Sequence, residues 1–230
     1  MALRPIFIPN SDSVGVVEKM IDFKWHAGMA ASQKKKSIIE LHQAANNIGI
    51  TNILEISSKS ETNLGVCLSA FNLLIKTKKY GNEFTVETAF QGSKVFEQGG
   101  PYKDLFGMDS LAAKKDIRLK TSGNLVSFNF FGKNFPLTPR TYFYDWVYIN
   151  ALVQHHDYVL ELKKYNGFSD IEFNPKKSIN CQAHAVALYL SLIKENSLDN
   201  ALESPEKFLS YTQYHYANQD RNIGIQKSLI

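Results

Sequence analysis

The chain has 230 residues, of which 44% are hydrophobic and 21% are charged, and its formal net charge is +4. This composition excludes a disordered tail and is typical of a folded protein. The mild positive charge fits an anionic ligand or a nucleic acid, and it fits an ordinary cytosolic enzyme equally well.

Two further features bound the class of protein. Cys67 and Cys181 belong to no CxxC pair and no Cys/His cluster, so we predict neither a disulfide framework nor a zinc site. The N-terminal stretch MALRPIFIPNSDS lacks the pattern of a signal peptide, and no apolar run of about 18 residues occurs in the sequence. We therefore expect a cytoplasmic protein that is not embedded in a membrane.

The first half of the chain predicts a helix followed by a strand. Residues 29–49 repeat apolar side chains at Ile38, Leu41 and Ala45, with Ser32 or a neighbour as the N-cap and Gly49 at the end. Residues 50–58, ITNILEISS, are typical of a strand.

The later elements follow from the same periodicities. We predict helices over 85–97, 112–120, 141–165, 180–195 and 203–216, a hairpin over 124–137 and a loop over 166–179. Helices therefore dominate, and the predicted class is α+β, as one mostly helical domain with a few short strands. We divide the chain into an N-terminal elaboration (1–50), a catalytic domain (51–196) and a helical tail (197–230).

The segment 85–97, TVETAFQGSKVFE, carries the first candidate site. On a helix, Glu87, Gln91 and Lys94 fall at i, i+4 and i+7 and so share one stripe. A helix that carries only a few polar groups, each flanked by aromatic residues, is typical of the wall of a pocket. The alternative, at roughly even odds, is that Glu87 caps its helix or forms a salt bridge with Lys94 or a nearby lysine.

Two other segments hold polar groups among apolar ones. In 141–165, Asp145 precedes Trp146. We favour a structural ion pair of Asp145 with Arg140 or Lys164 over a functional role by about two to one. Trp146 is likewise favoured as a core residue over a stacking platform by about two to one. In 166–180, Asp170 and Glu172 precede two lysines and a helix start, which is a natural seat for a phosphate. The members of this second group are Lys176, Lys177 and Asn180. The alternative, which is the more common one for two adjacent lysines, is a solvated surface pair.

Two carboxylates from separate elements, an aromatic ring and phosphate-binding lysines suit cleavage of a bond at the anomeric carbon of a sugar. No GxSxG, GxGxxG or GxxxxGK[ST] motif occurs, so a serine hydrolase, a Rossmann fold and a P-loop have no support. No metal or other cofactor is expected, because no ligand set is apparent.

Several motifs together resemble the NADAR (YbiA-like) superfamily. TVETAFQGSKVF matches its Glu-containing helix, YDW supplies the next block, and SDIEF and KSINCQA stand for the last two. LEISSKS, AFQGSKVFEQGGPY and DIEFNPKKSINCQA more narrowly resemble the NADAR proteins encoded beside DarT-type DNA ADP-ribosyltransferase toxins. LGVCLSAFN stands where the first block of the superfamily pattern would be, and Ala70 replaces the asparagine of that block. Phe173 stands where many members have tryptophan.

The resemblance implies an N-glycosidase that removes ADP-ribose from guanine in DNA or a free nucleotide, and so acts as an antitoxin to a DarT-type toxin. It implies catalytic roles for Glu87 and Asp170, and it makes Lys94 and Lys59 candidates for the pocket. Lys94 is expected either to hold a phosphate or ribose hydroxyl or to act covalently on a ring-opened sugar, and Lys59 is the other candidate for the covalent role. Trp146 is expected to stack on the base or ribose. The expected further ligand contacts are Gln91, Asn180, Lys176 and Lys177.

Two alternatives remain at this stage. One is an enzyme that acts on a small phosphoribosylamine or another damaged nucleotide, as YbiA-like relatives suggest. The other is a protein that binds ADP-ribose, NAD or the toxin without catalysis.

Overall fold

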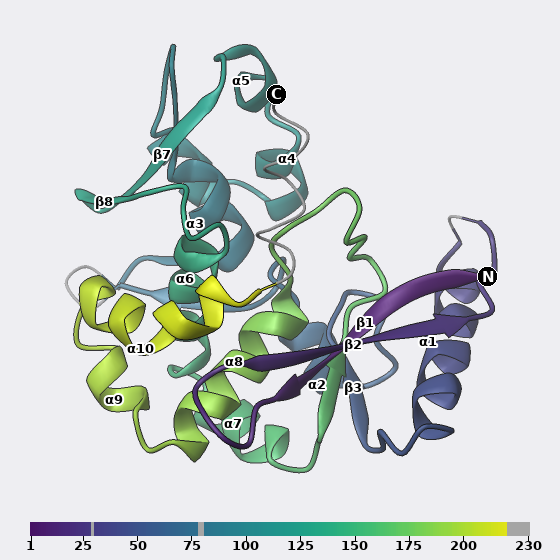
Figure 1. Cartoon of the computed structure of the whole chain (residues 1–230). Helices are drawn as coiled ribbons and strands as arrows, with labels where there is room; N and C mark the ends of the chain where they lie inside the picture. The colour runs from purple at the N-terminus through teal and green to yellow at the C-terminus, as the bar shows by residue number, and fades with distance from the viewer. Residues whose placement is uncertain (29, 78–80, 220–230) are drawn as a thin grey trace. The chain divides into compact units, whose positions relative to one another are not determined.

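The computed structural model describes residues 1–28, 30–77 and 81–219, and the chain divides into two compact units. Unit 1 holds Met1–Ser69 and the chain from His156 onward, whereas unit 2 holds Ala70–His155. Helices and several small sheets occur together, so the predicted α+β class is confirmed (Figure 1). The single domain and its three-part division stay predictions.

Unit 1 is built on a four-stranded sheet with the order β2-β1-β9-β3. Its strands are β1 (Ala2–Pro9), β2 (Val16–Phe23), β3 (Ile53–Glu55) and β9 (Gly167–Ser169). β1 pairs antiparallel with both β2 and β9, whereas β3 and β9 run parallel. The carboxyl ends of β3 and β9 therefore meet at one edge of the sheet.

Helices cover both faces of this sheet. The helices of unit 1 are α1 (Ala31–Asn46), α2 (Asn63–Cys67), α7 (His156–Leu162), α8 (Gln182–Lys194), α9 (Leu198–Ala201) and α10 (Pro205–Ala217). In β1, Ile6 packs in one cluster with Leu41 of α1, while its neighbour Phe7 contacts His184 of α8. Successive side chains of a strand point to opposite faces, so α1 and α8 lie on opposite sides of the sheet.

Unit 2 combines short helices with a two-stranded and a three-stranded sheet. Its strands are β4 (Leu74–Lys76), β5 (Glu83–Thr85), β6 (Lys94–Phe96), β7 (Leu125–Phe130) and β8 (Lys133–Phe135). Its helices are α3 (Val86–Gly92), the 3-10 helix η1 (Lys103–Gly107), α4 (Ser110–Lys114), α5 (Arg118–Thr121) and α6 (Tyr142–Leu152). Aromatic rings fill its interior: the Phe143 ring centroid lies 4.5 Å from that of Phe128 and 4.8 Å from that of Phe135.

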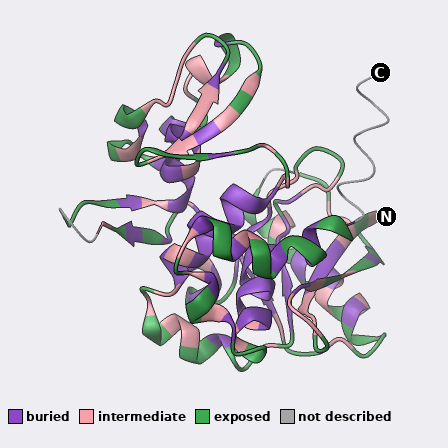
Figure 2. Ribbon diagram, turned by 60° about the vertical axis from the view of Figure 1, so that its left-hand side comes forward, coloured by how far each residue is buried: buried purple, intermediate pink, exposed green. Residues whose placement is uncertain are grey.

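The most periodic segments fold as predicted. α1, α8, α10 and the β7–β8 hairpin are confirmed, and Ile38, Leu41 and Ala45 are the buried apolar residues of α1. Details at the ends of α1 differ, because Ala30 is its N-cap without a side-chain bond and Asn47 rather than Gly49 is its C-cap. Buried residues gather on the inward faces of the helices and strands, whereas exposed residues lie in the turns, on outward helix faces and along much of β2 (Figure 2).

Three predicted helices are shorter or broken. The helix over 85–97 ends at Gly92, because the carbonyl of Ser93 accepts a strand-type bond from the Asn129 amide at 2.7 Å. The helix over 141–165 splits into α6 and α7. Between them, the Gln154 side chain accepts a hydrogen bond from the Lys76 amide of β4 at 2.9 Å. The segment 112–120 splits into α4 and α5.

Strands were also missed or overestimated. β9 lies inside the predicted loop 166–179, and the strand predicted over 50–58 is reduced to β3. The β1–β2 hairpin was not predicted at all. Part of the helix over 29–49 and of the tail over 197–230 falls on residue 29 and residues 220–230, which lie outside the described residues.

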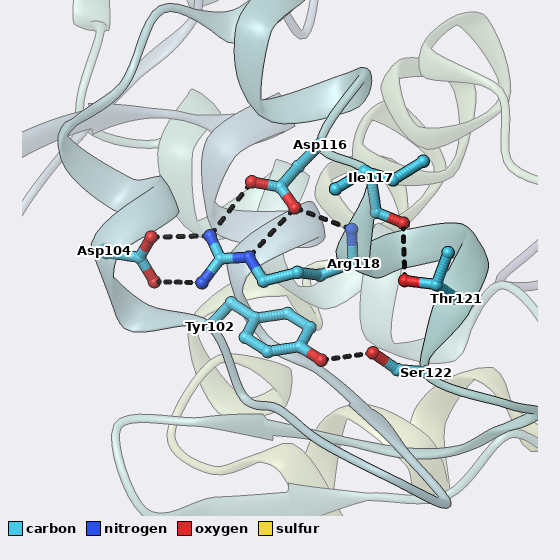
Figure 3. Close-up of polar contacts among 7 residues, drawn as sticks. All are labelled: Tyr102, Asp104, Asp116, Ile117, Arg118, Thr121 and Ser122. Carbon is cyan, nitrogen blue, oxygen red and sulfur yellow. Dashed lines mark hydrogen bonds and ion pairs between the residues drawn. The ribbon is translucent and has the colours of Figure 1, made fainter.

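One arginine ties η1 to the segment around α5 (Figure 3). The Arg118 guanidinium donates to Asp104 at 2.6 Å and to Asp116 at 2.9 Å, and it lies over the Tyr102 ring at 4.4 Å. The bonds to both carboxylates raise the pKa of Arg118. Because η1 packs against α3, this arrangement supports the helix that carries Glu87.

We expect Gly65→Ala to destabilise the protein by about 1–3 kcal/mol or more, because the new Cβ overlaps fixed backbone. A Cβ at Gly65 would lie 2.0 Å from the carbonyl oxygen of Glu55 and 2.2 Å from Ser60 Oγ. Gly107→Ala is the matched control, because nothing lies within 4 Å of its Cβ position. Urea unfolding measures both variants, and equal midpoints would contradict this packing of α2 on β3.

Candidate functional site

The first candidate cluster is built on α3 in unit 2. Thr85 caps this helix by accepting from the Thr88 amide, which places Glu87 in the first turn. Glu87 is 5% exposed, and its Oε1 accepts from Gln91 Nε2 at 2.8 Å. The predicted shared face of these two residues is therefore present, and it is buried.

Two lysines complete the cluster from other elements. Lys114 of α4 places its Nζ 3.6 Å from Glu87 Oε1, so the nearby lysine that forms the salt bridge is Lys114. Lys94 begins β6, and its Nζ lies 4.9 Å above the Phe90 ring. Burial lowers the pKa of Lys94 to about 8; the nearby Glu87 carboxylate opposes this shift, and Lys114 adds to it. Lys94 is therefore close enough to Glu87 for their charges to interact, but it lies on β6 rather than on the helix. The predicted i+7 geometry is wrong.

Gln91 offers an acceptor that the described residues do not use. It is 6% exposed, and its Oε1 is buried with no hydrogen-bond partner among the residues that the structure describes. A buried carbonyl oxygen without a donor costs about 1–3 kcal/mol. A ligand hydroxyl or amino group would satisfy it, which is consistent with the ligand-binding role predicted for Gln91.

The second cluster lies at the carboxyl edge of β3 and β9 in unit 1. Asp170 directly follows β9 and is 8% exposed. Its Oδ1 accepts from the amides of Glu172 and Phe173 at 3.0 and 3.2 Å. Burial raises the pKa of Asp170 to about 8, with the negative charge of Glu55 as the next cause. Asp170 is therefore a carboxylic acid, rather than a carboxylate, at about pH 7.

Glu55, the last residue of β3, was not singled out from the sequence. It is 3% exposed, and it accepts from Ser169 Oγ at 2.5 Å and from the Ile171 amide at 2.8 Å. The only sequence signal was an acidic residue at the end of an apolar strand, in LEISSKS.

Other predicted residues lie around the start of α8. Asn180 is half-buried just before the N-cap Cys181, and its Oδ1 is buried with no partner among the described residues. Lys176 and Lys177 are exposed in the preceding turn. Gln182 Nε2 donates to the Ile56 carbonyl at 2.6 Å, which ties this helix start to the end of β3.

Lys59 is half-buried in the turn that follows β3, and its Nζ donates to Ser58 Oγ at 3.0 Å. Its backbone amide donates to Ser57 Oγ at 3.1 Å. It belongs to unit 1, as Asp170 does. A covalent role for Lys59 stays a prediction.

Comparison with known proteins adds the family. The profile of the DarT1-associated NADAR antitoxins matches residues 2–222. The chain belongs to this family. The resemblance read from the motifs is thereby confirmed, and no curated protein matches the chain.

In this NADAR chain, Trp146 belongs to unit 2. It lies on α6, which packs against α3, and it is 9% exposed. Its carbonyl oxygen accepts from Asn150 Nδ2 at 2.8 Å. The neighbouring Asp145 is fully buried. A stacking role for Trp146 stays a prediction.

A cationic and aromatic group that no sequence motif indicated lies near the loop that carries Asp170. Trp25 lies between two cations, with Arg4 Cζ at 5.4 Å and Lys34 Nζ at 4.8 Å from its ring centroid. Lys34 also pairs with Glu172 at 3.5 Å, and Arg4 interacts electrostatically with Asp170. Lys34 of α1 therefore contacts Trp25 and Glu172 rather than solvent alone.

The described residues show neither a metal-binding cluster nor a membrane-spanning helix. In that part of the chain, no three His, Cys, Asp or Glu side chains are grouped so that they would hold a metal ion. Over the same ranges, no helix combines the length and apolar character needed to span a bilayer.

Proposed function

We propose that this NADAR antitoxin is an N-glycosidase that removes ADP-ribose from ADP-ribosylated guanine in DNA, and that this reaction counteracts a DarT1-type toxin. The family membership supports the antitoxin role. The observation that supports catalysis is the different surroundings of two buried carboxyl groups. Burial raises the pKa of Asp170 to about 8, whereas Glu87 accepts a hydrogen bond from Gln91 and forms an ion pair with Lys114.

A protonated Asp170 and a paired Glu87 suit cleavage of the bond between the ribose anomeric carbon and the guanine amino nitrogen. As the bond breaks, its electron pair stays on the guanine nitrogen, which takes a proton from the Asp170 carboxyl. The anomeric carbon becomes positively charged, and the Glu87 carboxylate stabilises that charge. Water finally supplies the hydroxyl group of free ADP-ribose, and its other proton returns to Asp170.

Lys94 suits a covalent route to the same products, in which its amine takes the place of direct addition of water. With a pKa of about 8, roughly a tenth of its side chains carry a neutral amine at about pH 7. In this route the bond between the anomeric carbon and the ring oxygen breaks first: the ring oxygen takes a proton, and the carbon becomes doubly bonded to the guanine nitrogen. We propose that the neutral Lys94 amine then adds to this carbon, and that the guanine amino group leaves with a proton from Asp170, giving an imine on Lys94. Water then hydrolyses the imine and regenerates the amine.

Borohydride trapping tests the role of Lys94. Cyanoborohydride added during turnover is expected to reduce the imine, so that mass spectrometry finds an ADP-ribose adduct on Lys94. Lys94→Arg keeps the charge but not the nucleophile, and it is expected to give no adduct and little turnover. Full activity of Lys94→Arg, or no adduct on the wild type, would show that water adds directly.

The remaining predicted residues are proposed to bind the substrate. Asn180, Lys176 and Lys177 adjoin the N-terminus of α8, where backbone N–H groups and the helix dipole favour a diphosphate. Lys59 follows β3 at the edge from which α8 begins. Trp146 is proposed to stack on the base or ribose.

The direct test is release of free ADP-ribose from an oligonucleotide that contains ADP-ribosylated guanine. Chromatography is expected to show free ADP-ribose together with the restored, unmodified oligonucleotide. The same assay on a phosphoribosylamine separates the two glycosidase functions. Cleavage of the small substrate alone would contradict the proposal, as would tight binding of the oligonucleotide without cleavage.

A further inference from the structure

The buried Glu55 is fixed by three donors. Ser169 Oγ donates to Oε2 at 2.5 Å, and the Ile171 amide donates to Oε1 at 2.8 Å. The Ser57 side chain also hydrogen bonds to this carboxyl group. Glu55 therefore binds the chain on both sides of Asp170, and so it holds the position of that residue.

A histidine on α1 sets the direction of this network. His42 Nε2 lies 2.8 Å from Ser169 Oγ, and burial lowers the pKa of His42 to about 4. His42 is therefore neutral at about pH 7. Because the Ser169 hydroxyl donates to Glu55, it accepts from His42, which assigns the proton of the imidazole to Nε2.

Glu55 and Asp170 differ in how many hydrogen bonds would stabilise each side chain as a carboxylate. Hydrogen bonds to a carboxylate favour its ionised form. Burial raises the pKa of the Glu55 carboxyl group as well, but three hydrogen-bond donors, Ile171, Ser169 and Ser57, oppose that rise. Asp170 Oδ1 accepts two amides, but within the described part of the chain Oδ2 meets no donor other than the Cys181 thiol, whose sulfur lies 3.9 Å away. When two neighbouring carboxyl groups share one charge, the charge therefore rests on Glu55 and the proton on Asp170 Oδ2.

The other charged groups around Asp170 do not reverse this order. Glu172, on the same loop, adds a second negative charge but is itself paired with Lys34. Arg4 of β1 interacts electrostatically with Asp170, and burial lowers the pKa of Arg4. The neutral His42 contributes no charge at about pH 7.

We propose that Glu55 is the positioning residue of the general acid: it fixes the loop on both sides of Asp170, through Ser169 and Ile171, and leaves Asp170 Oδ2 as the oxygen that carries the proton. This inference rests on the proposed function for its catalytic meaning. The placement of the proton can be measured without any substrate.

The experiment is a titration of the Asp170 carboxyl carbon by NMR in protein labelled with ¹³C-aspartate. The resonance is assigned by its loss in Asp170→Asn. In the wild type its midpoint is expected near pH 8. Glu55→Gln is expected to lower the midpoint by about one unit or more, because it removes the neighbouring charge at nearly constant shape.

Two further variants separate this role from a merely structural one. Glu172→Gln removes a nearby charge that does not bind the loop, and a smaller shift is expected. Ser169→Ala removes one donor to Glu55, so it is expected to move the proton toward Glu55 and also to lower the Asp170 midpoint. The wild-type titration decides the placement of the proton even if Glu55→Gln does not fold.

Activity provides the second readout. The alkaline limb of the pH profile is expected to follow the NMR midpoint, so that at about pH 8 Glu55→Gln retains about a tenth of its plateau rate and the wild type about half. A wild-type midpoint below about 6, or no shift in Glu55→Gln, would overturn the inference. If the wild type releases no ADP-ribose while Asp170 still titrates near 8, the proposed function fails and the pairing of Glu55 with Asp170 stands.

Discussion

Asp170→Asn is expected to slow the release of ADP-ribose by roughly 10²- to 10⁴-fold, because asparagine keeps the shape of the side chain but has no acidic proton to donate. Its Oδ1 can still accept from the amides of Glu172 and Phe173, so the fold should be preserved. The wild-type rate is expected to fall as pH rises through about 8, because the acid form is then lost. Single-turnover rates over the pH range measure both effects.

The same substitution is expected to change the pH dependence of stability. The pKa of Asp170 is raised from 3.8 to about 8 on folding, so the folded state binds the extra proton between these values. The contribution of this group to stability is therefore fully present below about pH 4, and it is lost as pH rises through about 8. An asparagine side chain does not titrate, so the unfolding free energy of Asp170→Asn should fall less over this window than that of the wild type. Parallel curves for the two proteins would contradict the buried acid.

Glu87→Gln is the second substitution with a large expected effect, a loss of turnover on the order of 10²-fold or more. Glutamine removes the charge that balances the developing cation, while its oxygen can still accept from Gln91. The affinity for the oligonucleotide should change little, because the lost interaction acts mainly in the transition state. Turnover and equilibrium binding, measured side by side, test this separation.

The control for Glu87→Gln is Glu83→Gln in the same unit, where an exposed carboxylate pairs with Lys76 at 3.3 Å. Such surface pairs contribute little, so this variant should behave as the wild type does. A Glu87→Gln protein that still neutralises the toxin without turnover would favour a sequestering antitoxin. Loss of binding together with turnover would assign Glu87 to ligand binding instead.

The sequence was most informative where one periodicity ran through a whole element. Ile38, Leu41 and Ala45 identified the buried face of α1, because a surface helix buries one stripe. The Glu87–Gln91 pair was predictable for the same reason, since i and i+4 are neighbours on any helix. The family motif supplied the reason to select these residues from other polar groups.

Long-range pairing explains most of what was missed. Lys94 has the sequence context of a helix, yet β7 draws its segment into a strand through the Ser93–Asn129 bond. β9 has only three residues inside a polar stretch, and its pairing with β1 and β3 decides its conformation. Such partners are distant in sequence, so no local pattern reports them.

Electrostatic partners were hidden for the same reason. Lys114 reaches Glu87 from a separate helix, and Glu55 lies 115 positions before Asp170 in the sequence. The pKa of a carboxyl group depends on burial and neighbouring charge, neither of which is written in its own segment. The choice of Asp170 as the acid therefore required the structure.

The most direct test of the central claim is the number of ADP-ribose molecules released per protein molecule. The wild type is mixed with about a hundredfold excess of the guanine-ADP-ribosylated oligonucleotide, and free ADP-ribose is quantified over time. An N-glycosidase is predicted to release many equivalents, with Glu87→Gln and Asp170→Asn almost inactive in the same assay. Release of no more than one equivalent by the folded wild type, with the oligonucleotide still bound, would contradict the account and identify a binding protein.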